Sequence, residues 1–266
     1  MSSTPGSPNG FKHKLRTGSE PLLGLWCNLA SDTAAEITAA AGFDWVLIDC
    51  EHAPNSLGTV ATQLRTLGGY HADGIVRPLA GGRDAIQQLL DVGAQTLLVP
   101  AVQTPEDANH LALSMLFPPA GIRGVASQTR AGGWGRVRHY YESARDELCL
   151  IAQIETASGL KNARAIAETD GVDAVFVGTS DLAAALGHIG QPNHPEVVEA
   201  VELVVQVAAD VGKPIGTLAL NAETAKRYYE KGFDFLGVGI DTHLFATATS
   251  ELIDLIRSWG RADHIT

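Results

Sequence analysis

The chain has 266 residues, 45% of them hydrophobic, and a formal net charge of -11 at pH 7. Such an acidic surface repels polyanions, so nucleic acid is not an expected partner. No stretch approaches the roughly 18 consecutive apolar residues of a membrane span, which argues against a membrane protein. The three cysteines, Cys27, Cys50 and Cys149, show no CxxC spacing. They fit a reducing compartment and predict a cytoplasmic protein.

The beginning of the chain differs in composition from the rest. Its first ten residues are rich in Ser, Pro and Gly. We therefore expect residues 1–20 to form a flexible tail with a short helix. Residues 21–266 are expected to form one catalytic domain, because barrels of roughly 250 residues fold as single units.

The rest of the chain alternates short apolar runs with helical patterns. Runs that are apolar throughout are typical of parallel strands buried on both faces. Eight such units within this length predict an α/β fold of the (β/α)₈ TIM-barrel type, with an open doubly wound sheet as the alternative. The predicted strands are Leu22–Cys27, Trp45–Asp49, 74–77, 96–100, Cys149–Ile154, 174–178, Ile215–Leu218 and 235–239.

Two predicted helices have an apolar face that ends before a glycine, which is a common helix stop. The faces are Ile86, Leu89 and Leu90 before Gly93, and Ala34, Ile37, Ala40 and Ala41 before Gly42. The longest interval between strands, 101–148, contains Pro118-Pro119 and a glycine-rich segment at 132–135. We expect this interval to cross the mouth of the barrel as a loop.

Two acidic residues follow neighbouring predicted strands. Barrel enzymes place their active sites at the carboxyl ends of the strands, and Glu155 and Asp181 stand at two of these ends. We expect both carboxylates to bind one divalent metal ion, Mg²⁺ or Mn²⁺, with Co²⁺ as a possible substitute. For either acid alone, a helix cap or a loop salt bridge is the alternative.

Thr179, Ser180 and Asp181 precede a helical pattern. Their backbone N–H groups are therefore the unpaired donors of a helix start and could hold a substrate carboxylate. The alternative is that Ser180 or Asp181 only caps the helix, although the two roles can coexist.

His52 follows the strand at 45–49. An imidazole is suited to proton transfer near neutral pH, although an isolated histidine is more often structural. Asp91 ends the helix that contains Ile86, so its negative charge faces the unfavourable end of the helix dipole. We expect a hydrogen bond from His52 to compensate Asp91.

Arg77 ends the strand at 74–77, beside the apolar core. It could stabilise an enolate oxygen as negative charge develops, or it could form a structural ion pair. Cys50 lies between Asp49 and Glu51, whose charges should raise the pKa of its thiol. We therefore interpret Cys50 as a packing residue rather than a nucleophile.

Several kinds of enzyme chemistry are excluded by what the sequence lacks. No lysine stands at the carboxyl end of a predicted strand, which argues against a Schiff-base aldolase. The chain also has no P-loop, no GxGxxG fingerprint and no GxSxG nucleophile elbow. Metal-assisted enolate chemistry is what remains.

An ordered set of segments resembles the HpcH/HpaI aldolase family over nearly the whole chain after Leu22. These segments are GFDW at 42–45, IDCEHAPN at 48–55, QLLDVGAQT at 88–96, PPAGIRG at 118–124 and QIET at 153–156. The resemblance implies a class II pyruvate aldolase acting on small molecules. Its substrates would be pyruvate, or a hydroxypyruvate-like 2-oxo acid, and an aldehyde.

The resemblance also implies roles for individual residues. Glu155 and Asp181 match the metal ligands, and His52 with Asp91 matches the catalytic dyad. During cleavage of a 4-hydroxy-2-oxo acid, His52, or a metal-bound water that it positions, would take the proton from the C4 hydroxyl. Arg77 matches the arginine that stabilises the resulting enolate.

Other matched positions concern substrate binding and assembly. Gln153 and the backbone at Ser180 and Asp181 match groups that contact pyruvate, and Trp26 matches an aromatic residue near the site. The family further implies a homo-oligomer, a hexamer built as a trimer of dimers with exchanged C-terminal helices. This agrees with the amphipathic segment 251–259, whose apolar residues are Leu252, Leu255 and Ile256.

Two departures from the family pattern stand near the site, namely Cys50 in place of a frequent glycine and Thr179-Ser180 in place of Pro-Ala or Pro-Asn. Neither removes a ligand. One alternative function is another metal-enolate lyase, either an oxaloacetate decarboxylase or an acyl-CoA lyase. The other is a non-catalytic barrel that binds a metabolite.

Overall fold

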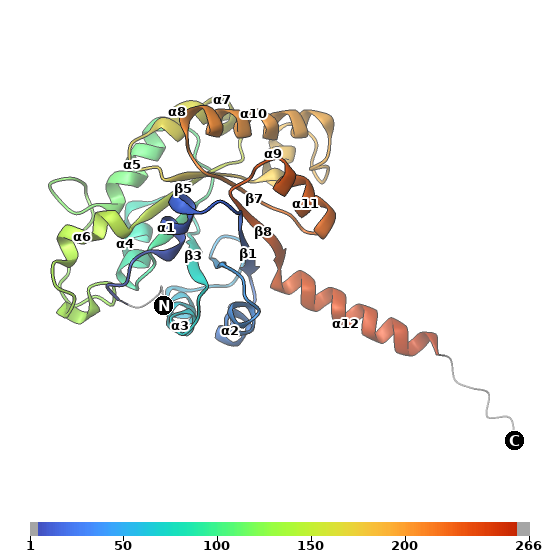
Figure 1. Cartoon of the computed structure of the whole chain (residues 1–266), viewed down its shortest axis with the longest axis horizontal. Helices are drawn as coiled ribbons and strands as arrows, with labels where there is room; N and C mark the ends of the chain where they lie inside the picture. The colour runs from blue at the N-terminus through green and yellow to red at the C-terminus, as the bar shows by residue number, and fades with distance from the viewer. Residues whose placement is uncertain (1–4, 260–266) are drawn as a thin grey trace, which may run out of the picture.

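Eight parallel strands close into a barrel in the computed structural model, which describes residues 5–259 (Figure 1). Each strand pairs with the next one in the sequence, and β8 pairs with β1. The predicted (β/α)₈ barrel is confirmed, and ring closure rules out the open sheet. The strands are β1 (Leu22–Cys27), β2 (Trp45–Asp49), β3 (Asp73–Arg77), β4 (Thr96–Val99), β5 (Cys149–Ile154), β6 (Ala174–Val177), β7 (Ile215–Leu218) and β8 (Phe235–Ile240).

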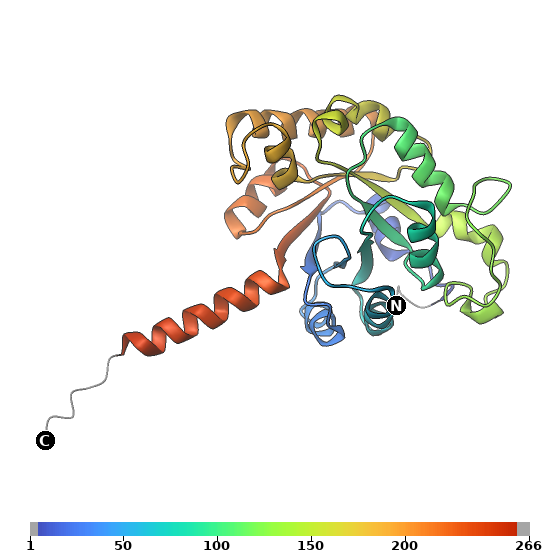
Figure 2. The same cartoon turned by 180° about the vertical axis from the view of Figure 1, so that it is seen from behind.

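Helices alternate with the strands, and most of them cover the outside of the barrel (Figures 1 and 2). Several begin at a side chain that accepts a hydrogen bond from the first turn, as Ser31, Ser56 and Thr104 do. The helices are α1 (Gly10–Thr17), α2 (Asp32–Ala40), α3 (Leu57–Leu67), α4 (Arg83–Asp91), α5 (Pro105–Met115), the 3₁₀ turn η1 (Gly133–Gly135), α6 (Tyr140–Glu147), α7 (Ala157–Lys161), α8 (Ala163–Glu168), α9 (Thr179–Ala185), α10 (Pro195–Val211), α11 (Ala222–Glu230) and α12 (Asp241–Ser258).

Aromatic side chains fill the interior of the barrel. Trp26, Trp45, Phe176 and Phe235 pack with ring centroids between 5.5 and 6.2 Å apart. Gly24 makes this packing possible, because a Cβ at that position would lie 2.0 Å from the Trp45 ring. Since the interior is a packed core, a ligand can reach only the side chains at the ends of the strands.

The amino-terminal segment is anchored to the barrel from Asn9 onward. Phe11 of α1 is fully buried against Trp45, and Asn9 Nδ2 donates to Thr96 Oγ1 at 3.0 Å. The short helix of this region is therefore α1, and it packs into the core together with Asn9. Residues 1–4 lie outside the described part of the chain.

α12 leaves the barrel as a projecting arm (Figures 1 and 2). Its first residue, Asp241, is buried and accepts hydrogen bonds from the backbone N–H groups of Asn28 and Leu29 at 2.8 and 3.1 Å. The helix exposes large apolar side chains, namely Leu244, Phe245, Leu252, Ile253, Leu255 and Ile256, and its C-cap residue Trp259 is exposed as well. None of the helices between residues 5 and 259 combines the length and apolarity of a membrane span.

The apolar face predicted for α2 is wrong. That face contains Ile37, which is 68% exposed, whereas Ala35, Thr38 and Ala39 face the core. Alanines on several sides of a helix give little contrast between faces, and Thr38 is tolerated inside because its hydroxyl donates to Ala34 O at 2.9 Å. The face predicted for α4 is confirmed, with Ile86, Leu89 and Leu90 buried.

The predicted crossing of the barrel mouth by the interval 101–148 is also wrong. None of its residues lines the cavity at the carboxyl ends of the strands. Its later part runs beside α4 and reaches the amino end of the barrel, where Ala131 N–H donates to Asp91 O at 3.2 Å and Glu147 accepts from Asn9 N–H at 2.6 Å. Proline and glycine content identifies a long connection, but it does not indicate which end of a barrel the connection covers.

Candidate active site

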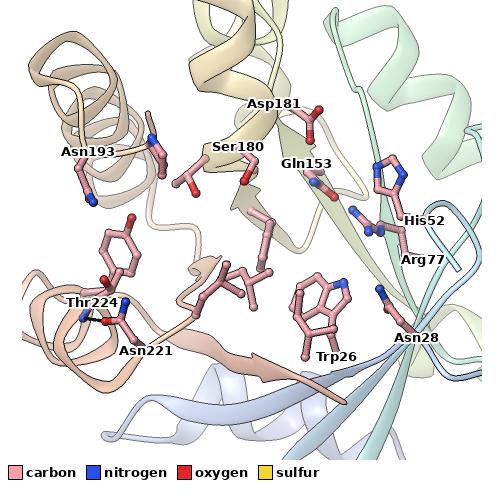
Figure 3. Close-up of a pocket in the computed structure, with 18 residues that line it drawn as sticks. Trp26, Asn28, His52, Arg77, Gln153, Ser180, Asp181, Asn193, Asn221 and Thr224 are labelled. Atoms are coloured by element: carbon pink, nitrogen blue, oxygen red, sulfur yellow. Dashed lines mark hydrogen bonds between the residues drawn. The ribbon is translucent and has the colours of Figure 1, made fainter. Parts of the chain in front are cut away.

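A cavity of about 310 Å³ opens at the carboxyl ends of β1, β3, β5, β6, β7 and β8. Its size suits a small ligand. Glu155 lies behind the lining, hydrogen-bonded to Gln153, and Asp91 is not part of the lining. The predicted residues that line the cavity, shown in Figure 3, are Trp26, His52, Arg77, Gln153, Ser180 and Asp181.

Two acidic side chains hold Arg77 in a fixed orientation. Asp49 stands beside Arg77 in the β2–β3 register and accepts from Nε at 2.9 Å and from Nη2 at 2.6 Å. Nη1 lies 2.9 Å from Glu51 Oε2. Burial by itself lowers the pKa of Arg77, but the hydrogen bonds and charge of Asp49, together with the charges of Glu51 and Glu155, outweigh it and raise that pKa. Arg77 thus forms the predicted ion pair and is also part of the cavity wall.

Glu155 is a buried carboxyl group at the end of β5. Its Oε1 accepts from Ala101 N–H at 2.7 Å, and its Oε2 accepts from the Gln153 side-chain amide. Burial raises the pKa of Glu155 to about 7 against the lowering effect of the Ala101 hydrogen bond, and the charges of Asp181 and Glu51 add to the rise. Near neutral pH, this carboxyl group therefore exchanges readily between its neutral and its ionised form.

The start of α9 brings Ser180 and Asp181 to the same edge of the barrel. The N-cap of α9 is Gly178, without a side-chain capping bond, so neither Ser180 nor Asp181 caps the helix. A Cβ at Gly178 would lie 2.4 Å from Glu155 Oε2. Glycine is therefore needed for the helix start to approach Glu155. The first backbone N–H groups of α9 have no capping side chain and lie beside the cavity.

The hydrogen bond predicted between His52 and Asp91 is not formed within one chain. His52 lies at the carboxyl end of the barrel, 61% exposed, with Nε2 3.7 Å from Glu51 Oε2. Because α4 returns to the amino end of the barrel, its last residue, Asp91, lies at the opposite end and accepts from Arg123 Nη2 at 2.8 Å. Asp91 does have a partner for its charge at the end of α4, but within the chain that partner is the buried Arg123.

Several polar residues of the cavity were not singled out from the sequence. Asn28 follows β1, and its buried Oδ1 has no hydrogen-bond partner in residues 5–259. Asn193, Asn221 and Thr224 stand across the cavity from Arg77 and form what we term the polar wall (Figure 3). Asn193 lies in a loop, and Asn221 and Thr224 lie at the start of α11, so no strand-end pattern marks them.

Cys50 is not activated as a nucleophile. Burial raises the pKa of its thiol to about 11, and the charge of Asp49 contributes to the rise. The predicted direction is confirmed, although burial has a larger effect than the neighbouring acid.

The carboxylates of this site fit a hard divalent cation. Glu51 and Asp181 lie close enough to Glu155 for their charges to raise its pKa, and a cation would relieve that repulsion. Beside them, Gln153 Oε1 is buried without a hydrogen-bond partner in the described residues. All of these donors are oxygen atoms, which Mg²⁺ and Mn²⁺ prefer.

A closed parallel barrel with acidic groups and a fixed arginine at its carboxyl end is the architecture of a (β/α)₈-barrel enzyme. A family model, HpcH/HpaI aldolase/citrate lyase, matches residues 22–248, and the chain belongs to this family.

Two relatives and one solved structure illustrate the similarity. The 4-hydroxy-2-oxo-heptane-1,7-dioate aldolase of Klebsiella pneumoniae is 49% identical over 92% of each chain. The enzyme of the same name from an Escherichia coli strain is 46% identical over 92% of this chain and 93% of its own. The crystal structure of a family protein from Burkholderia cenocepacia superposes with a TM-score of 0.91 at 40% identity, covering 94% of this chain and 99% of the other. These matches confirm the predicted family and the expectation of a carbon–carbon lyase.

Proposed function

We propose that this protein is an aldolase that reversibly cleaves a 4-hydroxy-2-oxo acid into an aldehyde and pyruvate, or a hydroxypyruvate-like 2-oxo acid. The observation that carries this proposal is the convergence of Arg77, Gln153, Asp181 and His52 on one cavity, with Glu155 directly behind it. The names of the relatives at 46 to 49% identity support the substrate class.

Glu155 and Asp181 would hold the divalent metal ion, Mg²⁺, Mn²⁺ or Co²⁺. Their hard oxygen donors and the repulsion between their charges support this assignment. When bound, the ion supplies Lewis-acid polarisation of the 2-oxo acid. The chain contributes a helix start that brings the two carboxylates together at Gly178.

Arg77 stabilises negative charge on the enolate oxygen. Asp49 and Glu51 fix the guanidinium before the reaction, so little reorganisation is needed as that charge develops. Gln153 and the backbone N–H groups at the start of α9 orient the pyruvyl group. Trp26 provides the apolar surface beneath it.

His52 acts as the general base in cleavage. It takes the proton of the C4 hydroxyl, the O–H electron pair forms the aldehyde carbonyl, and the electrons of the C3–C4 bond pass to the enolate. Protonation of C3 then gives the 2-oxo acid. Its exposed position at the rim of the cavity supports this role, because the proton can exchange with solvent.

The working enzyme is a homo-oligomer in which α12 packs on a neighbouring subunit, arranged as a hexamer of three dimers. The exposed apolar residues of α12 support this assembly, because such patches mark interfaces. Since His52 and Asp91 lie at opposite ends of one barrel, we place the His52–Asp91 pair between two subunits. A reducing cytoplasm suits the three cysteines, which are all free.

The test measures pyruvate release from 4-hydroxy-2-oxo acids in an assay coupled to lactate dehydrogenase. The protein is first treated with a chelator and then supplied with Mg²⁺, Mn²⁺ or Co²⁺. We expect release that depends on the ion and is lost in Glu155→Gln. Pyruvate formed from oxaloacetate alone would replace the aldolase by a decarboxylase, and turnover of acyl-CoA substrates alone would replace it by an acyl-CoA lyase. Metal binding without any turnover would favour a binding role.

A further inference from the structure

A second group of metal-ligating side chains lies between α9 and α10, outside the cavity lining. It consists of His188, His194 and Glu196, whose ligand atoms all lie within 4.8 Å of one another. We propose that this group, the His–His–Glu cluster, binds a borderline transition-metal ion of the Zn²⁺ class. The site is separate from the carboxylates around Glu155.

The backbone holds both histidines in place. His188 N–H donates to Ala183 O at 2.7 Å, which ties His188 to the end of α9 after Gly187 adopts a positive φ of 87°. His194 is the N-cap residue of α10, and its Nδ1 accepts from Glu196 N–H at 3.3 Å. The ligands therefore project from two helix ends whose positions the fold determines.

The two imidazole rings lie against each other in the cluster. They are stacked with their centroids 3.4 Å apart and their planes 15° apart. An ion binds in the plane of an imidazole, along the lone pair of its nitrogen, so two parallel rings do not direct both nitrogens at one ion. Binding therefore requires one imidazole to turn about its side-chain bonds, which the half-buried positions of both histidines allow.

Each ligand also has a donor atom available for the ion. His188 Nε2 lies 2.9 Å from Glu196 Oε2, so a cation placed between them would take the position of the shared proton. His194 uses Nδ1 for the capping bond, which leaves Nε2 as its free ring nitrogen. Two nitrogens, one carboxylate oxygen and a water complete four-coordination.

The carboxylates around Glu155 and the His–His–Glu cluster should prefer different metal ions, because their donor atoms differ. The donors around Glu155 are oxygens, which suit Mg²⁺, whereas two imidazoles favour Zn²⁺, Co²⁺ or Ni²⁺ over Mg²⁺. A large excess of Mg²⁺ should therefore leave the His–His–Glu cluster available to zinc.

The ion would also fix one side of the cavity. The segment between the two histidines contains Pro192 and Asn193, which line the cavity, and Asn193 Oδ1 accepts from Arg227 Nη2 at 2.8 Å. A metal ion bound by both His188 and His194 would fix the two ends of this segment relative to each other. We infer that zinc tightens the polar wall, and this second step rests on the proposed function.

The first experiment measures zinc stoichiometry without any use of activity. The chelator-treated full-length protein is titrated with Zn²⁺ in excess Mg²⁺ against a chromophoric zinc chelator. We expect the double variant His188→Gln with His194→Asn to bind one zinc fewer than the natural chain. Asparagine retains the N-cap acceptor and glutamine retains a side-chain donor, so the fold should persist. Zinc should raise the Tm of the natural chain and leave that of the double variant nearly unchanged.

Two controls separate this site from other zinc ligands. His139→Gln removes a second His–Glu pair, with His139 Nδ1 2.8 Å from Glu142 Oε2. Within residues 5–259 this pair belongs to no group of three metal-ligating side chains, so zinc stoichiometry should not change. Glu155→Gln should retain the zinc that the double variant loses. Equal stoichiometry in the natural chain and the double variant would overturn the proposal, as would an equal loss in His139→Gln.

A kinetic comparison tests the link to the cavity. With Mg²⁺ saturating, zinc should lower the KM for the aldehyde in condensation by the natural chain and have no such effect on the double variant. A zinc site confirmed by stoichiometry with no change in KM would retain the metal site and refute the tightening of the wall. Absence of aldolase turnover would refute the proposed function while the zinc measurement stands.

Discussion

Replacing Glu155 by glutamine should stabilise the metal-free protein at alkaline pH. The fold raises the pKa of Glu155 from 4.5 to about 7, chiefly through burial. Well below pH 4.5 the carboxyl group is neutral in both the folded and the unfolded chain, so its ionisation does not affect stability. Between pH 4.5 and about 7 the folded protein keeps a proton that the unfolded chain has lost, so stability falls as pH rises. Glutamine cannot ionise and avoids that loss.

The structure sets the size of the effect. The rise in the pKa of Glu155 from 4.5 to about 7 corresponds to about 3 kcal/mol at pH 8, since one pKa unit is about 1.4 kcal/mol. The introduced amide oxygen can still accept from Ala101 N–H, which lies 2.7 Å from the carboxylate. The NH₂ group of the introduced glutamine would face the side-chain amide of Gln153. That amide can rotate so that its Oε1, which has no hydrogen-bond partner in residues 5–259 of the natural chain, accepts from the new NH₂ group. The hydrogen bonds are thus largely kept, and we expect a net gain of about 2–3 kcal/mol.

The assay is urea denaturation of chelator-treated protein at pH 5 and pH 8, at one protein concentration because assembly affects stability. The exposed Glu199→Gln serves as a control for the same change of charge and should alter stability little at either pH. The free energy of unfolding of Glu155→Gln should be clearly higher than that of the natural chain at pH 8 and only slightly higher at pH 5. The reasoning is refuted if its advantage is absent at pH 8, or is the same at both values. Added Mn²⁺ should stabilise the natural chain and not Glu155→Gln.

Three further variants test the roles of other residues. Arg77→Lys should lower kcat by about 10²- to 10³-fold, because lysine cannot keep the bidentate pair with Asp49, and circular dichroism should show an intact fold. Inactive His52→Ala and Asp91→Asn proteins, refolded together, should regain part of the pyruvate-release activity that each lacks, whereas no recovery would place the two residues in separate functions. Leu255→Glu in α12 should shift the protein to smaller species in light scattering, and an unchanged mass would refute the role of that helix in assembly.

The eight strands could be predicted closely from the sequence because each is mainly apolar on both faces. Four of them, including β2 and β5, begin and end at the predicted residues. Burial on both faces removes the alternation of an ordinary strand, and the polar residues that follow mark the end nearest the solvent. The same rule predicted that Arg77, Gln153 and Asp181 share one edge, which the cavity lining confirms.

Partners within the site were harder to predict than positions. Asp49 and Glu51 were visible at the end of β2, but only the register of β2 with β3 shows that they hold Arg77. Asp91 was assigned to His52 from its charge at a helix end and from the family resemblance, but the direction of α4 carries it to the other end of the same barrel. The sequence shows which side chain stands at the end of a strand or helix. Which other side chain it contacts depends on how several strands and helices pack together.

The charges around the cavity imply an order of binding for the ligands. In the part of the chain that the structure describes, Asp49, Glu51, Glu155 and Asp181 lie near the permanent cation Arg77, which Asp49 and Glu51 already engage. Without a metal ion, protonation of Glu155 near pH 7 is the way in which the site reduces this excess. An anionic 2-oxo acid entering first would meet net negative charge, whereas a divalent cation entering first would meet ligands and displace that proton. Burial is the chief cause of the raised pKa of Glu155, and the charges of Asp181 and Glu51 add to it. A cation would relieve the repulsion among these carboxylates, so substrate binding should follow metal binding.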